Sequence, residues 1–288
     1  MDRKEFLKKG IIGSGAAIAL GALATSAAET NKDEYPPQVG SNHIPNKETI
    51  MKENMLIHRN ETRGHADHGW LNAHHSFSFA NYYNPERMNF GVLRVLNDDI
   101  VAPGRGFSTH PHDNMEIITI PLSGDLEHKD SMGNGTVIKQ NDVQVMSAGT
   151  GIYHSEFNHN SDKEVRLLQI WVFPNKRNVE PRYDQITLPI SNRNVMQQIL
   201  SPNVGDDGVW IHQNAWFHMG YLDKGFKGEY TIKKEGNGVY AFVIEGTIEL
   251  GGETLNRRDA GGVWNTSSFA FEASEDSQLL LLEVPMKA

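Results

Sequence analysis

Two short segments of the sequence each place two metal-binding side chains one residue apart. His110 and His112 flank a proline, and His154 and Glu156 flank a serine further along the chain. Alternate residues of an extended strand point to the same face, so each segment presents two ligand atoms in one direction. If the two strands are neighbours, three imidazoles and one carboxylate meet at one point. The alternative is a set of scattered surface histidines, but each pair also lies beside a glycine cluster, which favours a built site.

Such a set of nitrogen and oxygen donors is typical of divalent transition metals that keep coordination positions open for a substrate. We expect one metal ion, with Fe(II) as the expected ion and Mn, Ni, Cu, Co and Zn as alternatives. The sequence contains no cysteine, which excludes disulfides, thiolate zinc sites, iron–sulfur clusters and cysteine nucleophiles. Histidine and carboxylate side chains are therefore the strong ligands that remain, and the chain has 13 histidines.

Several other residues of the same half compete for a place in this site. Glu116 is a rival for the carboxylate position, because it lies on the same strand face as His112. Other histidines are expected to line a pocket or to be structural (His65, His68, His74 and His75), or to lie at the surface or behind the ligands (His128 and His159). Four aromatic residues are expected in a barrel core, where one of them can wall the pocket: Phe77, Phe79, Tyr82 and Tyr83.

The elements that must position these side chains have the pattern of β-strands. From Met55 onward, short runs of alternating apolar and polar residues are separated by Gly, Asn, Asp and Pro. The clearest runs are Phe90–Leu96, Glu116–Leu122, Val165–Val172, Tyr240–Ile244 and Leu279–Val284. Helical periods are scarce, and Asn194–Leu200 is a short helix candidate. We therefore expect an all-β protein of the sandwich, barrel or jelly-roll type.

The two halves of the chain repeat one short pattern. Residues 122–128 have the sequence Leu-Ser-Gly-Asp-Leu-Glu-His, and residues 244–250 have the sequence Ile-Glu-Gly-Thr-Ile-Glu-Leu. Each segment lies near the middle of a β-rich half, so two copies of one small barrel explain the repeat. The second copy has no His-x-His and no histidine after His218. We therefore expect a metal only in the first copy.

The spacing around the ligand pairs resembles that of the cupin superfamily and, more specifically, of the pirin family. The first cupin motif is matched by Gly104, His110, His112 and Glu116, and the second by Gly151, His154 and Asn158. The segment 97–158 closely resembles pirins. The likeness extends upstream through 67–71 and 77–83 and downstream through 169–171 and 181–183. In total it covers nearly all of residues 55–288.

This resemblance implies a bicupin fold, with two antiparallel double-stranded β-helix (jelly-roll) barrels and one metal in the first barrel. The ligands of the family fall on His110, His112, His154 and Glu156, which favours Glu156 over Glu116 as the carboxylate ligand. Several bacterial pirins resemble quercetin 2,3-dioxygenases. The implied activity is the cleavage of a flavonol-like substrate with O₂, with Glu156 as the general base. The alternative is a non-catalytic, metal-binding and redox-sensing interaction protein, which some family members resemble.

The chain departs from the family pattern at two positions. Asp113 follows the histidine pair where relatives usually carry Arg or Lys, which adds an acidic group beside the metal and bears on the substrate accepted. Asn141 replaces the usual glycine before Asp142. Because Asn tolerates the left-handed conformation, we expect this replacement to be a turn variant.

The first 28 residues have the layout of a secretory signal peptide. Basic residues near the start precede an apolar run rich in Gly and Ala from Gly10 to Leu23, and small residues precede Glu29. Arg3–Lys8 resembles the twin-arginine export motif, with Lys in place of the second Arg. We therefore expect export to the periplasm, with no stable membrane span after cleavage.

The remaining chain divides by composition into a linker and two domains. Residues 29–54 are polar and contain prolines, which indicates a flexible tether. We expect the metal-binding cupin domain at 55–185 and a metal-free cupin domain at 190–288. The formal net charge of −9 argues against binding to nucleic acid, which needs a basic face. We expect a monomer.

Overall fold

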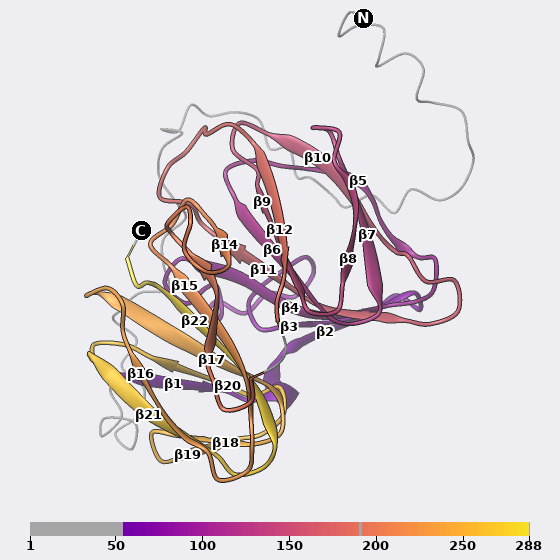
Figure 1. Cartoon of the computed structure of the whole chain (residues 1–288). Helices are drawn as coiled ribbons and strands as arrows, with labels where there is room; N and C mark the ends of the chain where they lie inside the picture. The colour runs from indigo at the N-terminus through magenta and orange to yellow at the C-terminus, as the bar shows by residue number, and fades with distance from the viewer. Residues whose placement is uncertain (1–53, 190–191, 288) are drawn as a thin grey trace, which may run out of the picture. The chain divides into compact units, whose positions relative to one another are not determined.

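The computed structural model describes residues 54–189 and 192–287, which form β-strands joined by turns and loops (Figure 1). The expected signal peptide (1–28) and nearly all of the expected linker (29–54) lie outside the described residues. Within the described ranges the only helical element is one 3₁₀ turn, η2 (Asn60–Thr62), and no helix there is long and apolar enough to cross a membrane. The expectation of an all-β protein is confirmed.

The first half of the chain forms a barrel from two antiparallel sheets. Its larger sheet has the strand order β12-β9-β6-β11-β4-β3-β2, and its smaller sheet has the order β5-β10-β7-β8. The larger sheet contains β2 (Gly64–Asp67), β3 (Leu71–His75), β4 (Leu93–Val101), β6 (Glu116–Ser123), β9 (Asp142–Ser147), β11 (Val165–Val172) and β12 (Arg182–Thr187). The smaller sheet contains β5 (Gly106–His112), β7 (Asp125–Asp130), β8 (Gly135–Lys139) and β10 (Ile152–Asn158).

The second barrel repeats this arrangement, with the orders β1-β20-β17-β22-β15-β13-β14 and β16-β21-β18-β19. The larger sheet contains β1 (Met55–His58), β13 (Gln197–Ser201), β14 (Val209–Trp210), β15 (Trp216–Leu222), β17 (Asn237–Glu245), β20 (Ala260–Val263) and β22 (Ser277–Pro285). The smaller sheet contains β16 (Lys227–Thr231), β18 (Ile248–Leu250), β19 (Glu253–Leu255) and β21 (Ser268–Ala273). The helix expected at Asn194–Leu200 was wrong, because this segment leads into β13, whose backbone pairs with β15.

The repeated sequence pattern marks the same turn in both barrels. Gly124 joins β6 to β7 and Gly246 joins β17 to β18, with φ angles of 75° and 83°. A Cβ atom at Gly124 would lie 2.8 Å from the carbonyl oxygen of Glu164, and one at Gly246 would lie 2.4 Å from that of Asp276. Glycine is required because the left-handed backbone and the close approach both exclude a side chain. Each turn carries the chain from the larger sheet to the smaller one.

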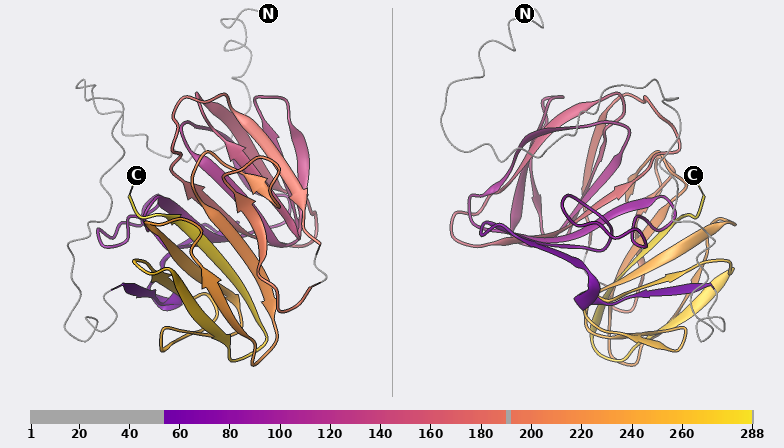
Figure 2. Two further views of the ribbon diagram at one scale, coloured as in Figure 1. Left: turned by 60° about the vertical axis from the view of Figure 1, so that its left-hand side comes forward. Right: turned by 180° about the vertical axis from the view of Figure 1, so that it is seen from behind.

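The first strand of the described chain belongs to the sheet of the second barrel. β1 pairs antiparallel with β20, so that Met55 lies opposite Val263 and His58 lies opposite Ala260. Figure 1 and Figure 2 show this strand in indigo among orange and yellow strands. In the first barrel β12 has the corresponding place beside β9. The domain expected from residue 55 onward therefore begins with a strand that completes the other barrel.

An apolar core is shared by residues of both barrels. It includes Phe77, Phe90 and Leu93 from the first barrel and Phe217, Tyr240 and Phe242 from the second, each 2% exposed or less. The ring centroids of Phe77 and Tyr240 lie 5.4 Å apart, and those of Phe90 and Tyr240 lie 5.5 Å apart. Removal of this apolar surface from water stabilises the fold by roughly 25 cal/mol per Å².

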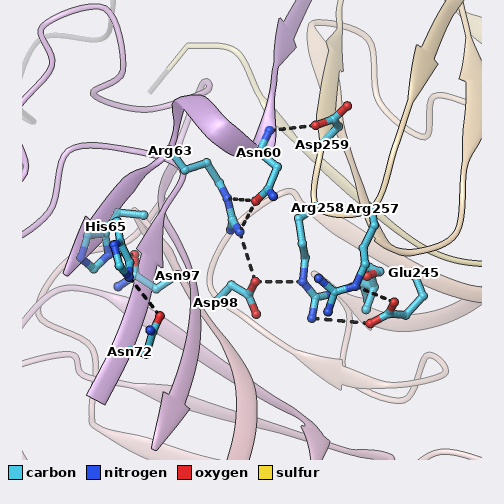
Figure 3. A network of polar contacts seen from close by, with 12 residues as sticks. Asn60, Arg63, His65, Asn72, Asn97, Asp98, Glu245, Arg257, Arg258 and Asp259 are labelled. Carbon is cyan, nitrogen blue, oxygen red and sulfur yellow. Dashed lines mark hydrogen bonds and ion pairs between the residues drawn. The ribbon is translucent and has the colours of Figure 1, made fainter. Parts of the chain in front are cut away.

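Asp98 of β4 adds ion pairs to this core (Figure 3). Its Oδ2 lies 3.2 Å from Nη2 of Arg63, which directly precedes β2, and 2.8 Å from Nε of Arg258, in the second barrel. The two arginine side chains are 2% and 4% exposed, so solvent screens these pairs weakly. Loss of one partner would leave a buried charge, which costs about 3–5 kcal/mol in comparable sites.

Candidate metal centre

The two segments with paired ligands form neighbouring strands of the smaller sheet of the first barrel. β5 and β10 run antiparallel, and their register places His110 directly opposite His154. An irregularity in the pairing lies between His154 and Glu156. The strand geometry expected from the sequence is therefore present: both pairs lie on adjacent strands of one sheet.

Three imidazole rings gather at this place. The ring centroids of His110 and His154 lie 4.4 Å apart, and the ring of His112 lies 4.9 Å from each of them. One ring nitrogen from each histidine lies within 4.8 Å of the others. We call these three residues the outer group. Both ring nitrogens of His154 are buried and have no hydrogen-bond partner among the described residues, so the lone pair of its unprotonated nitrogen is free for an ion.

The surroundings keep the rings of His112 and His154 neutral and orient the ring of His110. Burial and the neighbouring rings of His154 and His110 lower the pKa of His112 to about 3. Burial, with His110 and His128 nearby, lowers the pKa of His154 to about 3. Nδ1 of His110 lies 2.8 Å from the carbonyl oxygen of Ser108, so a proton on Nδ1 leaves Nε2 free as a ligand. Neutral imidazole is the form that binds metals.

Glu156 is buried beside this group and is held by an amide. Its side chain is 4% exposed, and Nε2 of Gln169 on β11 lies 3.1 Å from both of its oxygens. The hydroxyl of Thr119 lies 3.4 Å from Oε1 of Glu156 and 3.3 Å from Oε1 of Gln169, so its one proton serves one of the two. The carboxylate is thus fixed from the side of the larger sheet.

His128 lies next to the ligands. It was expected at the surface or behind the ligands, and its fully buried side chain rules out the surface. One ligand atom each from His128, His154 and Glu156 lie within 4.8 Å of one another. We call these three residues the inner group, and His154 belongs to both groups. The signal for His128 was its alternation with Leu126 and Asp130 along β7, which faces all three inward.

Glu116, the rival carboxylate, has a different environment. It begins β6, is 1% exposed and accepts a hydrogen bond of 2.6 Å from Oγ of Ser147. It belongs to neither group of ligand atoms. Burial raises its pKa to about 7, although the hydrogen bond from Ser147 and the nearby Arg182 act in the opposite direction.

The remaining histidines lie elsewhere. His65 and His74 stack on β2 and β3 with ring centroids 4.5 Å apart, and His75 on β3 contacts Asn97 through a hydrogen bond of 2.8 Å. Half of the His159 side chain (51%) is exposed, and it lies beside Glu127. These residues do not join either group of ligand atoms among the described residues.

Trp171 lies beside the site, and Phe79 packs against Trp171. The ring of Trp171 lies 4.9 Å from that of His112 and 5.3 Å from that of Phe79. Nε1 of Trp171 is buried and has no hydrogen-bond partner within residues 54–189 and 192–287. Phe77, at 1% exposed, is in the core as expected, whereas the same expectation for Tyr83 was wrong, since it is 73% exposed.

The two departures from the family pattern are both visible. Asp113 directly follows β5 and is exposed, with Oδ1 accepting a hydrogen bond of 3.3 Å from Asn114. Asn141 has a φ angle of 75°, which confirms that it takes the left-handed conformation in the turn between β8 and β9.

The donor set fits a divalent transition metal. It combines neutral imidazoles with one carboxylate, and the unpartnered nitrogens of buried His154 satisfy the need of such an ion for free lone pairs. Ligand atoms bound to one ion at about 2.1 Å lie roughly 3 Å apart, so these atoms, which lie within 4.8 Å of one another, come closer together when an ion binds.

Two family models match the chain. The model described as "Pirin" matches residues 57–172, and the model described as "Quercetinase C-terminal cupin domain" matches residues 198–284. These matches coincide with the two halves that carry the repeated glycine turn.

Relatives of known sequence and structure cover the same region. The quercetin 2,3-dioxygenase of Escherichia coli (strain K12) is 39% identical over 231 residues, which cover 80% of this chain and 99% of that protein. The pirin-like protein of Caulobacter vibrioides is 39% identical over 222 residues, or 76% of this chain and 95% of that protein. The crystal structure of the bacterial pirin YhhW from Escherichia coli in complex with nickel(II) has a TM-score of 0.76 and 38% identity, and covers 80% of this chain and 99% of its own.

Proposed function

The chain belongs to the pirin family, and from this premise we propose that it is a metal-dependent dioxygenase that cleaves a flavonol, similar to quercetin, with O₂. The observation that carries this proposal is the cluster of imidazole donors beside one fixed carboxylate in the first barrel. The relatives named quercetin 2,3-dioxygenase support the substrate class.

The residues that would hold the metal are His110, His112, His154 and Glu156. We expect Fe(II), with Mn, Ni, Cu, Co and Zn as alternatives, and the nickel(II) complex of the related pirin supports a divalent ion. When bound, such an ion supplies Lewis acidity and a template that brings the substrate hydroxyl and O₂ together.

Glu156 acts as the general base in this proposal. Its carboxylate accepts the proton of the flavonol 3-hydroxyl, which makes the ring system electron-rich toward O₂. Gln169 holds both carboxylate oxygens at 3.1 Å and keeps them in a fixed plane. Because Glu156 is 4% exposed, little water competes for the same proton.

The aromatic wall positions the substrate. The ring of Trp171, against which Phe79 packs edge to face, suits contact with a flat aromatic molecule and helps to exclude water from the reacting atoms. Nε1 of Trp171 donates to a substrate oxygen, which gives this buried N–H the partner that it lacks within the protein. The net reaction takes up both atoms of O₂, opens the heterocycle and releases one CO.

The test compares aerobic with anaerobic turnover of quercetin by the metal-loaded protein. We expect loss of quercetin and release of CO only with O₂, and a fall of about 100-fold or more in kcat for Glu156→Gln with metal retained, as for loss of a general base. A Glu156→Gln variant that keeps the metal and the wild-type rate would contradict the base role. No O₂-dependent loss of substrate would favour the alternative, a metal-binding and redox-sensing interaction protein.

Export is a separate proposal, which is supported by the basic and apolar pattern of residues 1–28. Fractionation of cells that express the full chain should find a shortened protein in the periplasm. Replacement of Arg3 and Lys4 by Ala should retain the full-length chain in the cytoplasm, and unchanged export would contradict the twin-arginine-like route.

A further inference from the structure

His128 has the environment of a metal ligand. Its side chain is fully buried, and its ring lies 5.3 Å from that of His154 and 5.0 Å from that of Tyr183. The register of β7 and β10 places His128 directly opposite Glu156. A buried imidazole in this place must have partners for its ring nitrogens or lose free energy.

Only one of those nitrogens has a partner in the part of the chain that the structure describes. Nε2 of His128 lies 3.2 Å from Oδ2 of Asp130, whereas its Nδ1 is buried and unpartnered. A histidine that donates one N–H to a carboxylate and keeps its other nitrogen free is the usual arrangement of a metal-bound histidine. The proton on Nε2 fixes the tautomer and leaves the lone pair on Nδ1.

Asp130 is itself rigidly placed. Its Oδ1 accepts hydrogen bonds from the backbone N–H of Met132 and of Asn134, and its Oδ2 accepts a bond of 2.8 Å from the side chain of Asn134. The side chains of His128 and Asp130 are both fully buried. This support orients the His128 ring in the way that outer partners orient the ligands of metal sites.

We propose that the first barrel has a second cation position, formed by His128, His154 and Glu156. This inner position shares His154 with the outer group, so one ion occupies one position or the other. The ligand atoms of each group of three residues lie within 4.8 Å of one another, but those of all five residues together do not. The inference rests on the metal site of the proposed function, but it does not depend on flavonol turnover.

Charge separates the roles of the two positions. At the inner position an ion of charge 2+ is balanced by Glu156 and, through the His128 ring, by Asp130. At the outer group the imidazoles carry no compensating charge and Glu156 is the one carboxylate of the proposed ligand set, so part of the ion's charge stays uncompensated, which favours the arrival of an anionic substrate oxygen. The inner position therefore suits storage of the ion, and the outer group suits reaction.

The test removes the outer group and asks what still binds. In the full-length chain, His110→Ala/His112→Ala removes two outer ligands and leaves the inner position intact. Calorimetric titration with Ni²⁺ should still show one ion per chain, with Kd weakened by no more than about 100-fold. Addition of His128→Phe should weaken the remaining binding by a further ~10-fold or more, since the ring shape stays and the donor is lost.

Two controls keep this experiment decisive. His159→Gln, added to the double variant, removes an exposed histidine and should leave the Kd unchanged within about 2-fold. If the Phe variant fails to fold by circular dichroism, His128→Gln replaces it. If the wild type binds Ni²⁺ and the double variant does not, the inner position is refuted. It is also refuted if the substitution of His128 leaves the Kd of the double variant unchanged. Neither outcome contradicts the metal site of the proposed function. If the wild type itself does not bind Ni²⁺, the metal site of the proposed function is refuted as well.

Discussion

The two barrels share one topology but fill it with different chemistry. Gly124 and Gly246 are equivalent, so residues at the same distance from them along the chain correspond, and the strand registers extend this correspondence to the paired strands. The inner-facing pair His154 and Glu156 on β10 corresponds to Phe269 and Phe271 on β21. The residues that hold Glu156, Thr119 and Gln169, are also replaced in the second barrel.

Ala241 on β17 takes the place of Thr119, and Leu281 on β22 takes the place of Gln169. Phe271, Ala241 and Leu281 all belong to the apolar cluster that fills the second barrel. Every polar group that fixes Glu156 is thus replaced by an apolar one. The same backbone can hold a reactive cluster or a packed core, and this chain uses one copy for each.

The second barrel does contain a buried carboxylate, but all its acceptor sites are used. Glu283 accepts hydrogen bonds from the hydroxyl of Tyr230, from the backbone N–H of Lys233 and Lys234, and from the side chain of Asn237. These bonds fix the turn between β16 and β17. Glu156, by contrast, is held by one amide and one shared hydroxyl, which leaves lone pairs for a ligand. A buried carboxylate indicates a site only when its acceptors are not saturated.

The comparison predicts that the second barrel carries packing energy and no metal affinity. Phe271→Ala should lower the free energy of unfolding by about 3–5 kcal/mol, as for other buried aromatic truncations. Urea unfolding measures the loss, and Ni²⁺ titration under native conditions should give the wild-type Kd. A lower metal affinity in a folded Phe271→Ala protein would show that the two barrels are coupled.

Glu116 should make the stability of the first barrel depend on pH. The equivalent residue of the second barrel is Gly238, which has no titratable side chain. Burial raises the pKa of Glu116 from 4.5 to about 7, so the folded state binds the proton more tightly than the unfolded state. This stabilisation is complete below pH 4.5 and is lost as the pH rises through 7. Between pH 5 and 8.5 the loss is about 2–3 kcal/mol, at about 1.4 kcal/mol per pKa unit.

Glu116→Gln should remove this dependence. The free energy of unfolding of both proteins is measured by urea unfolding at pH 5 and at pH 8.5. Relative to the wild type, Glu116→Gln should be more stable at pH 8.5 than at pH 5. An equal difference at both pH values would refute the raised pKa.

The common member of the two ligand groups should matter most for metal binding. His154→Ala should weaken Ni²⁺ binding by more than about 100-fold, because loss of a ligand costs more than loss of a residue that only hydrogen-bonds to a ligand. Titration calorimetry measures the change, and Phe269→Ala, at the equivalent place in the second barrel, is the matched control with wild-type affinity. Comparable affinities in His154→Ala and wild type would mean that the ion binds elsewhere.

The residue of the second barrel can also be transplanted into the first. Gln169→Leu copies Leu281 and removes the amide that holds Glu156, so we expect kcat to fall by about 10-fold, near the worth of one hydrogen bond to a charged group. Metal content by atomic emission should remain at the wild-type level. Turnover at the wild-type rate would show that Gln169 does not position the base.

The sequence predicted the parts of this site that depend on local spacing. The one-residue spacing in β5 and β10 was enough to place His110 with His112, and His154 with Glu156, on shared faces. The bounds expected for β11, Val165–Val172, are those of the structure. What it missed depends on pairing between distant strands. His128 becomes an inner residue only through the register of β7 with β10, and β13 is a strand because β15 lies beside it.

The place of β1 has a consequence for how the chain is made. This strand leaves the ribosome early, yet its partner β20 ends at Val263, so the pair cannot form until almost the whole chain has been synthesised. Contacts so far apart in sequence slow folding, because a long loop must close first. Until then β20 has an open edge, the kind of edge that pairs with other chains. The last barrel to be synthesised is therefore completed by β1, the first strand of the described residues.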